Sequence, residues 1–100
     1  MSQRQIIIAR VYTLEGHEHL TRTLDILQQE KVAGVTVIRG IEGIGEAGEL
    51  HTSSLLTLSL ELPVIIEFYD ESVKIDEIIT LLKNKLDLKH IVSWPVTAHI

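Results

Sequence analysis

The chain has 100 residues, of which 45% are hydrophobic, and this is enough apolar material for one globular domain. Fourteen acidic residues against nine Lys and Arg give a formal net charge of −5, and only 4% of the residues are aromatic, so a nucleic-acid-binding surface is not expected. The absence of cysteine excludes disulfides, thiolate nucleophiles and cysteine-based zinc sites.

The first part of the chain predicts a strand, a helix and a second strand. Residues 6–13 are rich in β-branched side chains and contain no breaker, which is typical of a strand. Between residues 17 and 30, Leu20, Leu24 and Leu27 recur at helical spacing among polar residues and predict an amphipathic helix. Residues 35–41 form a second β-branched run, so the order begins strand, helix, strand.

A long loop is predicted at about residues 41–55, where neither a helical nor a strand period is present. Four of the six glycines of the chain lie between residues 40 and 48, at the start of this loop. Residues 41–54 carry three glutamates and no Lys or Arg, which gives the segment a local charge of −3. Long ordered loops in small domains are usually functional, so this segment is the first candidate for a site.

The rest of the chain predicts a strand, a helix and a last strand. Residues 56–69 alternate between apolar and polar side chains, and Pro63 within the run indicates an edge, a bulge or a break between two strand segments. Residues 90–100 also alternate, and Pro95 indicates an edge strand. Between these runs, after Asp70 and Glu71, a helical stripe is formed by Ile75, Ile78, Ile79, Leu82 and Leu86.

This order predicts the α+β, ferredoxin-like βαββαβ fold as a single domain over residues 1–100, with a four-stranded antiparallel sheet and two helices on one face. The other face would carry apolar side chains, which such a small domain commonly buries by self-association. The apolar stretch at residues 6–9 is too short for a signal peptide, and no run approaches the roughly 18 residues of a membrane span. We therefore expect a cytoplasmic homo-oligomer.

Three stretches together resemble the PII-like signalling proteins, in particular the branch catalogued as domain of unknown function one-ninety. They are Gly-Val-Thr-Val-Ile-Arg-Gly-Ile-Glu-Gly-Ile-Gly at 34–45, Glu-Leu-His-Thr at 49–52 and Leu-Pro-Val-Ile-Ile-Glu at 62–67. The resemblance covers residues 6–100. It implies a PII-like homotrimer whose loop meets partners and whose inter-subunit clefts take small effectors, typically adenine nucleotides.

Candidate ligand-binding residues follow from the resemblance and from their chemistry. Thr36 matches the strand position near the nucleotide base, and Gly43 and Gly45 match the Gly-x-Gly at the base of the loop, where glycines can let backbone N–H groups converge on an anion. Arg39 can offer a charge-assisted contact to a phosphate or carboxylate. The alternative is that the glycines only let the loop turn and that Thr36 is an ordinary strand residue. The remaining two candidates are the matched pair His51 and Thr52, although Thr52 also suits a turn-capping role.

The chain departs from signal-transducing PII proteins at the positions that meet phosphates. Glu46 and Ala47 stand where those proteins have a basic residue and a glutamine, and residues 86–90 contain no glycine. Because the loop carries three negative charges, a triphosphate should be repelled. A monophosphate, a diphosphate or a cyclic nucleotide is the better expectation, with the absence of any nucleotide as the alternative.

We expect a regulator rather than an enzyme, because no nucleophile, base and orienting group are patterned together. Effector binding would order the loop and change its affinity for a protein partner such as a membrane transporter, with no further cofactor. No metal site is expected, because the helical His-x-x-x-His spacing is missing. The alternative function is a metal-binding or purely structural trimer with no nucleotide ligand.

Two further side-chain roles are predicted. Glu61 and Glu67, on the polar face of the third strand, should be cross-strand salt-bridge partners rather than acid–base groups. Trp94 should be a core anchor on an edge strand or part of a subunit contact.

Overall fold

The computed structural model describes residues 2–16, 18–44, 48, 50–52, 62–88 and 90–99. Its elements are β1 (Gln3–Leu14), α1 (Glu18–Gln29), β2 (Gly34–Arg39), β3 (Glu42–Ile44), β4 (Leu50–Thr52), β5 (Pro63–Asp70), α2 (Ser72–Leu86) and β6 (Ile91–His99).

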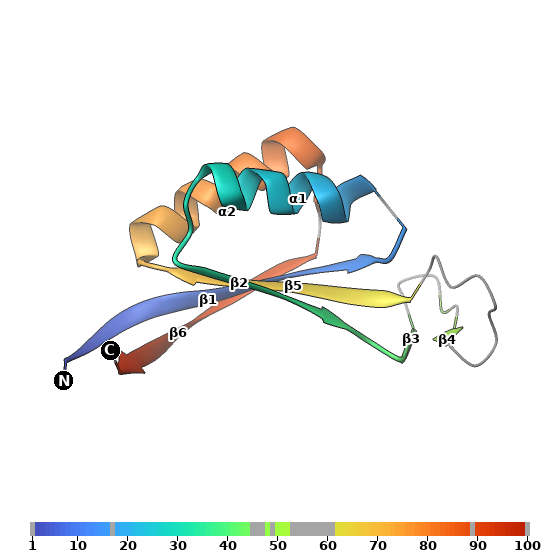
Figure 1. Cartoon of the computed structure of the whole chain (residues 1–100), viewed down its shortest axis with the longest axis horizontal. Helices are drawn as coiled ribbons and strands as arrows, with labels where there is room; N and C mark the ends of the chain where they lie inside the picture. The colour runs from blue at the N-terminus through green and yellow to red at the C-terminus, as the bar shows by residue number, and fades with distance from the viewer. Residues whose placement is uncertain are drawn as a thin grey trace.

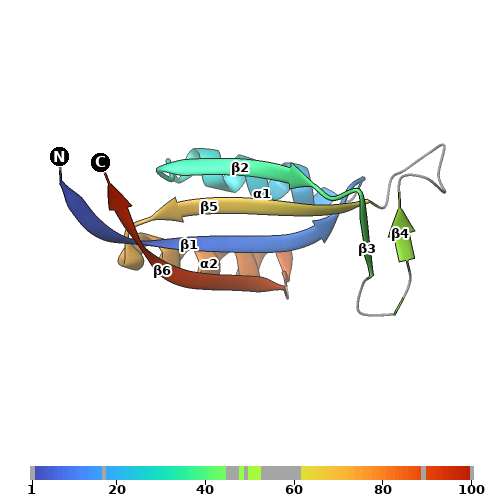
Figure 2. The same ribbon diagram turned by 90° about the horizontal axis from the view of Figure 1, so that it is seen from below.

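Four of these strands form an antiparallel sheet in the order β2-β5-β1-β6, and both helices cover the same face of it (Figure 1). The predicted α+β ferredoxin-like fold is therefore confirmed. Figure 2 looks onto the other face of the sheet, which no described element covers; we call it the open face.

Part of the predicted loop is regular, which corrects the expectation of an irregular segment. β3 and β4 pair with each other as a two-stranded antiparallel ribbon that leaves the end of the main sheet (Figure 2). Each strand has only three residues, too few for an alternating pattern to be visible in the sequence.

The two prolines occupy positions that a strand tolerates. Pro63 is the first residue of β5, where a missing N–H costs little, and the predicted break between two strand segments stays a prediction. β5 lies between β2 and β1, which rules out the edge role for Pro63. Pro95 lies in β6, and β6 is an edge strand as predicted. The alternation at 56–61 lies outside the described residues.

The core lies between the helices and the sheet and uses the residues that periodicity selects. From the α2 stripe, Ile79 is only partly buried, whereas the other four residues are buried. Val64, Ile66 and Phe68 of β5 are buried against them, and Leu27 of α1 is fully buried. The largest fully buried apolar side chains are Phe68, Leu27, Ile66, Ile75, Ile78 and Leu82.

Asp70 ties the end of β5 to both helical connections. Its Oδ1 accepts the N–H of Glu71 at 2.7 Å, just before α2, and its Oδ2 accepts the N–H of Ala33 at 2.9 Å, just before β2. Lys74 lies 3.8 Å from the same carboxylate and donates to the carbonyl of Lys31 at 3.1 Å. The Asp70 carboxylate therefore links the end of β5 to the segment before β2 and to the start of α2.

Thr23 in α1 gives a test of this packing. It is fully buried, and its Oγ1 has no hydrogen-bond partner among the described residues. Thr23→Val keeps the shape and removes the unsatisfied hydroxyl, so we expect a gain of about 1 kcal/mol in unfolding free energy. Thr23→Ser, which keeps the hydroxyl and loses the methyl group, should destabilise the protein. Urea unfolding at one protein concentration measures both, and a Thr23→Val variant less stable than wild type would contradict the assignment.

Candidate functional site

The two stems of the long loop are held together at the end of the sheet by a closed ring of contacts. The N–H of Gly40, just after β2, donates to the carbonyl of Pro63 at 2.7 Å, and the N–H of Glu15 donates to the carbonyl of Leu62, also at 2.7 Å. The side chain of Arg39 closes the ring, because its Nη2 donates to Oε1 of Glu15. We call these five residues the loop root.

Close packing explains two of the four clustered glycines. A Cβ on Gly40 would lie 2.8 Å from Cγ of Pro63, and a Cβ on Gly43 would lie 3.0 Å from the same atom. Neither residue has a positive φ, a conformation that the described glycines adopt only at Gly16 and Gly48. At Gly43 the absent side chain thus makes room for the proline ring, and a positive φ does not explain the glycine at this position. Gly45 lies outside the described residues.

Within one chain, the structure does not bring Thr36 and Arg39 together. Thr36 is paired with Glu67 and lies on the open face, whereas Arg39 is paired with Val64, whose side chain is buried under the helices. Successive side chains of a strand point to opposite faces, so these two positions serve different surfaces.

The ribbon gathers three of the remaining candidates beside the loop root. Gly43 of β3 is the cross-strand partner of His51, and Glu42 is the partner of Thr52. Because β3 begins three residues after Arg39, the ribbon and the arginine belong to one region of the molecule. Gly43, His51 and Thr52 are therefore neighbours as backbone positions.

Glu15 is the residue that the sequence did not reveal. It lies in the turn between β1 and α1. Arg39, its contact, is 24 residues away in the sequence, so no local pattern predicts this contact. The glutamate side chain is 20% exposed and that of Arg39 is 66% exposed. The other carboxylate oxygen, Oε2, is buried and has no partner among the described residues. Only one of the two carboxylate oxygens of Glu15 therefore has a hydrogen-bond donor among the described residues.

The open face has a charged centre in apolar surroundings. Arg10 and Glu67 form an ion pair at 2.9 Å, which confirms the cross-strand role predicted for Glu67, while Glu61 lies outside the described residues. The hydrogen bond with Glu67, and then that with Tyr12, raise the pKa of Arg10 above its ordinary value. The guanidinium carbon also lies 5.5 Å from the centre of the Trp94 ring, within cation–π range.

Trp94 is therefore not a core anchor. It is 37% exposed and pairs with Ile8 on the open face, so the sheet register turns it away from the helices. The other predicted role, a contact between subunits, stays a prediction. Large apolar or aromatic side chains exposed with it on this face are Tyr12, Ile38, Tyr69 and Val92.

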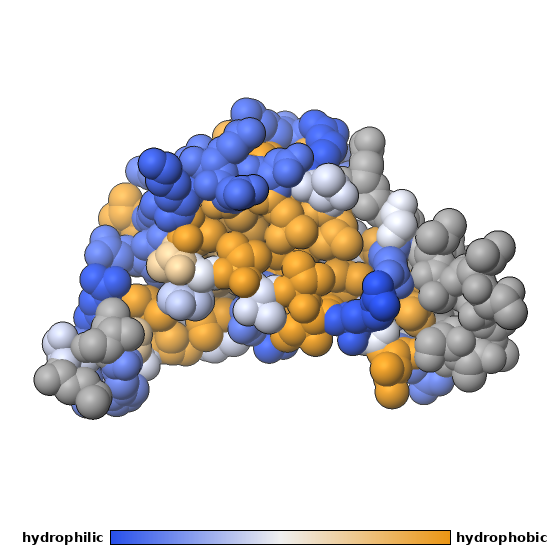
Figure 3. Space-filling view, viewed as in Figure 1, coloured by the Kyte–Doolittle hydropathy of each residue, from blue (hydrophilic) through white to orange (hydrophobic). Residues whose placement is uncertain are grey.

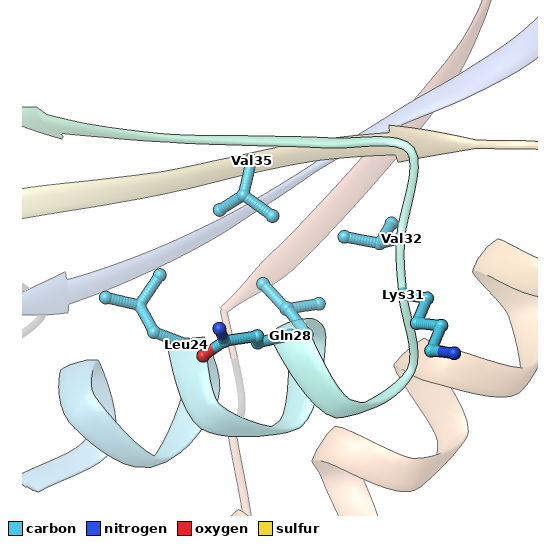
Figure 4. A pocket seen from close by; sticks show the side chains of 6 residues that line it. Leu24, Gln28, Lys31, Val32 and Val35 are labelled. Carbon is cyan, nitrogen blue, oxygen red and sulfur yellow. The ribbon is translucent and has the colours of Figure 1, made fainter.

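A second apolar surface lies along the β2 edge. The space-filling view shows an apolar band between the helix layer and the sheet on this side (Figure 3). Here a shallow groove separates α1 from β2, and Leu24 and Val35 point toward each other across it, with Gln28 and Lys31 on its rim (Figure 4).

Two other kinds of feature are absent from the residues that the structure describes. These ranges contain no group of three or more His, Asp or Glu side chains that could hold a metal ion. None of the helices within them is long and apolar enough to cross a membrane.

Comparisons with known proteins agree on one family. Residues 3–98 match the family model DUF190, described as "Uncharacterized ACR". A UPF0166 protein of Aquifex aeolicus is 32% identical over 69 residues, which cover 69% of this chain and 71% of that protein.

Solved structures share the fold at lower identity. CPII of Thiomonas intermedia, a nitrogen regulatory PII-like protein bound to ADP, AMP and bicarbonate, has a TM-score of 0.71 at 15% identity and covers 99% of this chain and 91% of its own. CutA1 of Oryza sativa has a TM-score of 0.65 at 16% identity, with 96% and 84% covered. With a family match that spans nearly all of its residues, the chain belongs to the DUF190 family, and it shares its fold with CPII.

Proposed function

We propose that this protein is a homotrimeric PII-like regulator that binds a small effector, of the adenine mono- or diphosphate class, in clefts between subunits. It acts by binding rather than by catalysis. Effector binding changes the loop that leaves the sheet at the loop root, and the loop carries the signal to a protein partner.

The division of the candidate residues between two surfaces is the observation that carries this proposal. Thr36 lies on the open face and Arg39 on the helix-covered side, so a single chain does not present both side chains to a small ligand on one surface. A cleft formed with a second copy, in which one subunit presents its open face and the other its loop root, removes this difficulty. The exposed apolar side chains of the open face support such an assembly, since soluble monomers rarely expose large contiguous apolar patches.

The effector class is supported by likeness and by charge. CPII has the same fold and is described with ADP and AMP bound. In this chain the loop root has one basic residue, Arg39, and residues 41–54 contain three glutamates. One guanidinium can bind one or two phosphate groups. A third phosphate would lie near the acidic loop, with no further basic residue at the loop root to compensate its charge.

The partner-binding role of the loop is supported by two isoleucines in or beside β3. Ile41 is 78% exposed and Ile44 is 72% exposed, which are the highest values among the large apolar side chains of the described residues. Apolar side chains at such a protruding position suit insertion into a partner, because a partner pocket would remove both from water.

Assembly through the open face is tested by a matched pair of valines. Val92 lies on this face and is 46% exposed, while Val73 at the start of α2 is 71% exposed on the helix layer. Val92→Asp should dissociate the trimer, because its carboxylate would be buried between subunits beside Arg10, whose charge Glu67 already compensates, and burying such an excess charge is costly. Val73→Asp should leave it intact. Light scattering should give three times the 11.3 kDa chain mass for wild type and Val73→Asp. A wild-type monomer, or an intact Val92→Asp trimer, would argue against this interface.

Effector binding is tested by thermal melting with AMP, ADP and ATP. A ligand at 100 times its Kd adds about 2.7 kcal/mol of stability, which raises Tm by several degrees in a domain of this size. We expect AMP or ADP to give the larger shift and ATP the smaller one. Arg39→Gln should reduce the shift, whereas Arg4→Gln, which removes the same charge at the far end of β1, should not. If no adenine nucleotide moves Tm at millimolar concentration, the effector class is wrong.

A further inference from the structure

The loop root contains an internal anion in contact with the arginine that an effector needs. Glu15 occupies Nη2 of Arg39 with the same type of oxygen that a phosphate or carboxylate ligand would present. Arg39 is the more exposed of the two side chains, so a ligand from solvent can reach the guanidinium without first unfolding the turn that carries Glu15.

The contact leaves one carboxylate oxygen of Glu15 without a hydrogen bond from the part of the chain that the structure describes. Its Oε2 is buried without a partner among the described residues, and a buried carboxylate oxygen without a donor is costly. When Arg39 turns to a ligand, Glu15 can rotate out of the turn and expose both oxygens to water. The hydration that Oε2 recovers offsets the lost ion pair, so a ligand of modest affinity can exchange the two states.

The same contact joins the site to the loop. In the ring at the loop root, the links from Gly40 to Pro63 and from Glu15 to Leu62 are made by the backbone. The ion pair between Glu15 and Arg39 is the side-chain link that closes it. Breaking this link separates the outgoing stem of the loop from the β1–α1 turn, while both backbone bonds can persist.

We infer that Glu15 is a competing anion that holds Arg39 and closes the loop root until a phosphate-bearing effector displaces it. This inference rests on the proposed function and adds to it the regulation of the same site. The effector therefore does two things with one exchange of partners: it gains the guanidinium, and it opens the ring that holds the loop stems.

Pyrophosphate binding to the full-length protein tests the competition without assuming a nucleotide. Glu15→Gln lowers the charge of the competitor, and if the pair is closed about nine-tenths of the time, freeing Arg39 tightens pyrophosphate binding by up to about tenfold. Glu42→Gln is the matched control, since Glu42 is exposed on β3 and the variant makes the same change in net charge. It should tighten binding by less than about twofold, as expected for screened charge alone. Equal effects of the two variants, or no gain in Glu15→Gln, would overturn the inference.

A second measurement uses the unaltered protein. On addition of pyrophosphate, the NMR chemical shift of the Glu15 carboxyl carbon should move toward that of a solvated glutamate. Pyrophosphate that binds while Glu15 keeps its shift would also overturn the inference. The proposed function fails separately: if nucleotides do not bind but Glu15→Gln still gains pyrophosphate affinity over wild type, only the nucleotide assignment is lost.

Discussion

The packing of the Pro63 ring against the backbone of Gly40 and Gly43 fixes where the long loop leaves and re-enters the sheet. A Cβ at Gly40 would lie 2.8 Å from the proline ring, which real Cβ atoms almost never do, and a Cβ at Gly43 would lie 3.0 Å from it, which is tighter than most real Cβ contacts. This close approach lets the carbonyl of Pro63 accept the N–H of Gly40 and positions β3 beside the end of β5. The direction of the β3–β4 ribbon, and hence the place where a partner would meet Ile41 and Ile44, depends on that contact.

The fold could be predicted because each main element has its own local pattern. The α2 stripe and the apolar even-numbered positions of β5 face the core as periodicity indicates, and β6 is the edge strand that Pro95 indicates. The ribbon could not be predicted, because strands of three residues show no period. The two predicted roles of Trp94, a core anchor and a subunit contact, could not be separated, because alternation gives two faces of a strand without saying which one the helices cover.

The candidate site was less predictable, since it depends on contacts distant in sequence. The cluster of glycines correctly marked the base of the loop, but the partner that explains Gly40 and Gly43 is Pro63, about twenty residues later. Thr36 and Arg39 lie three residues apart in one strand, which suggests proximity, yet the pleat sends them to opposite faces. Glu15 carries no motif at all and becomes visible only when the sheet order brings the end of β1 near the end of β2.

The open face and the loop root place two ion pairs in contrasting settings. Arg10 is held by Glu67 and by the ring of Trp94, so its charge is compensated on the face proposed for assembly, and it need not be released for subunits to associate. Arg39 is held by Glu15 alone among the contacts described, on an exposed stem beside an acidic loop. A charge with two partners in an apolar setting is suited to a permanent contact, because losing either partner leaves it poorly solvated. A charge with one exchangeable partner near water is suited to a reversible one, and this difference supports the proposed assembly contact at Arg10 and the proposed response at Arg39.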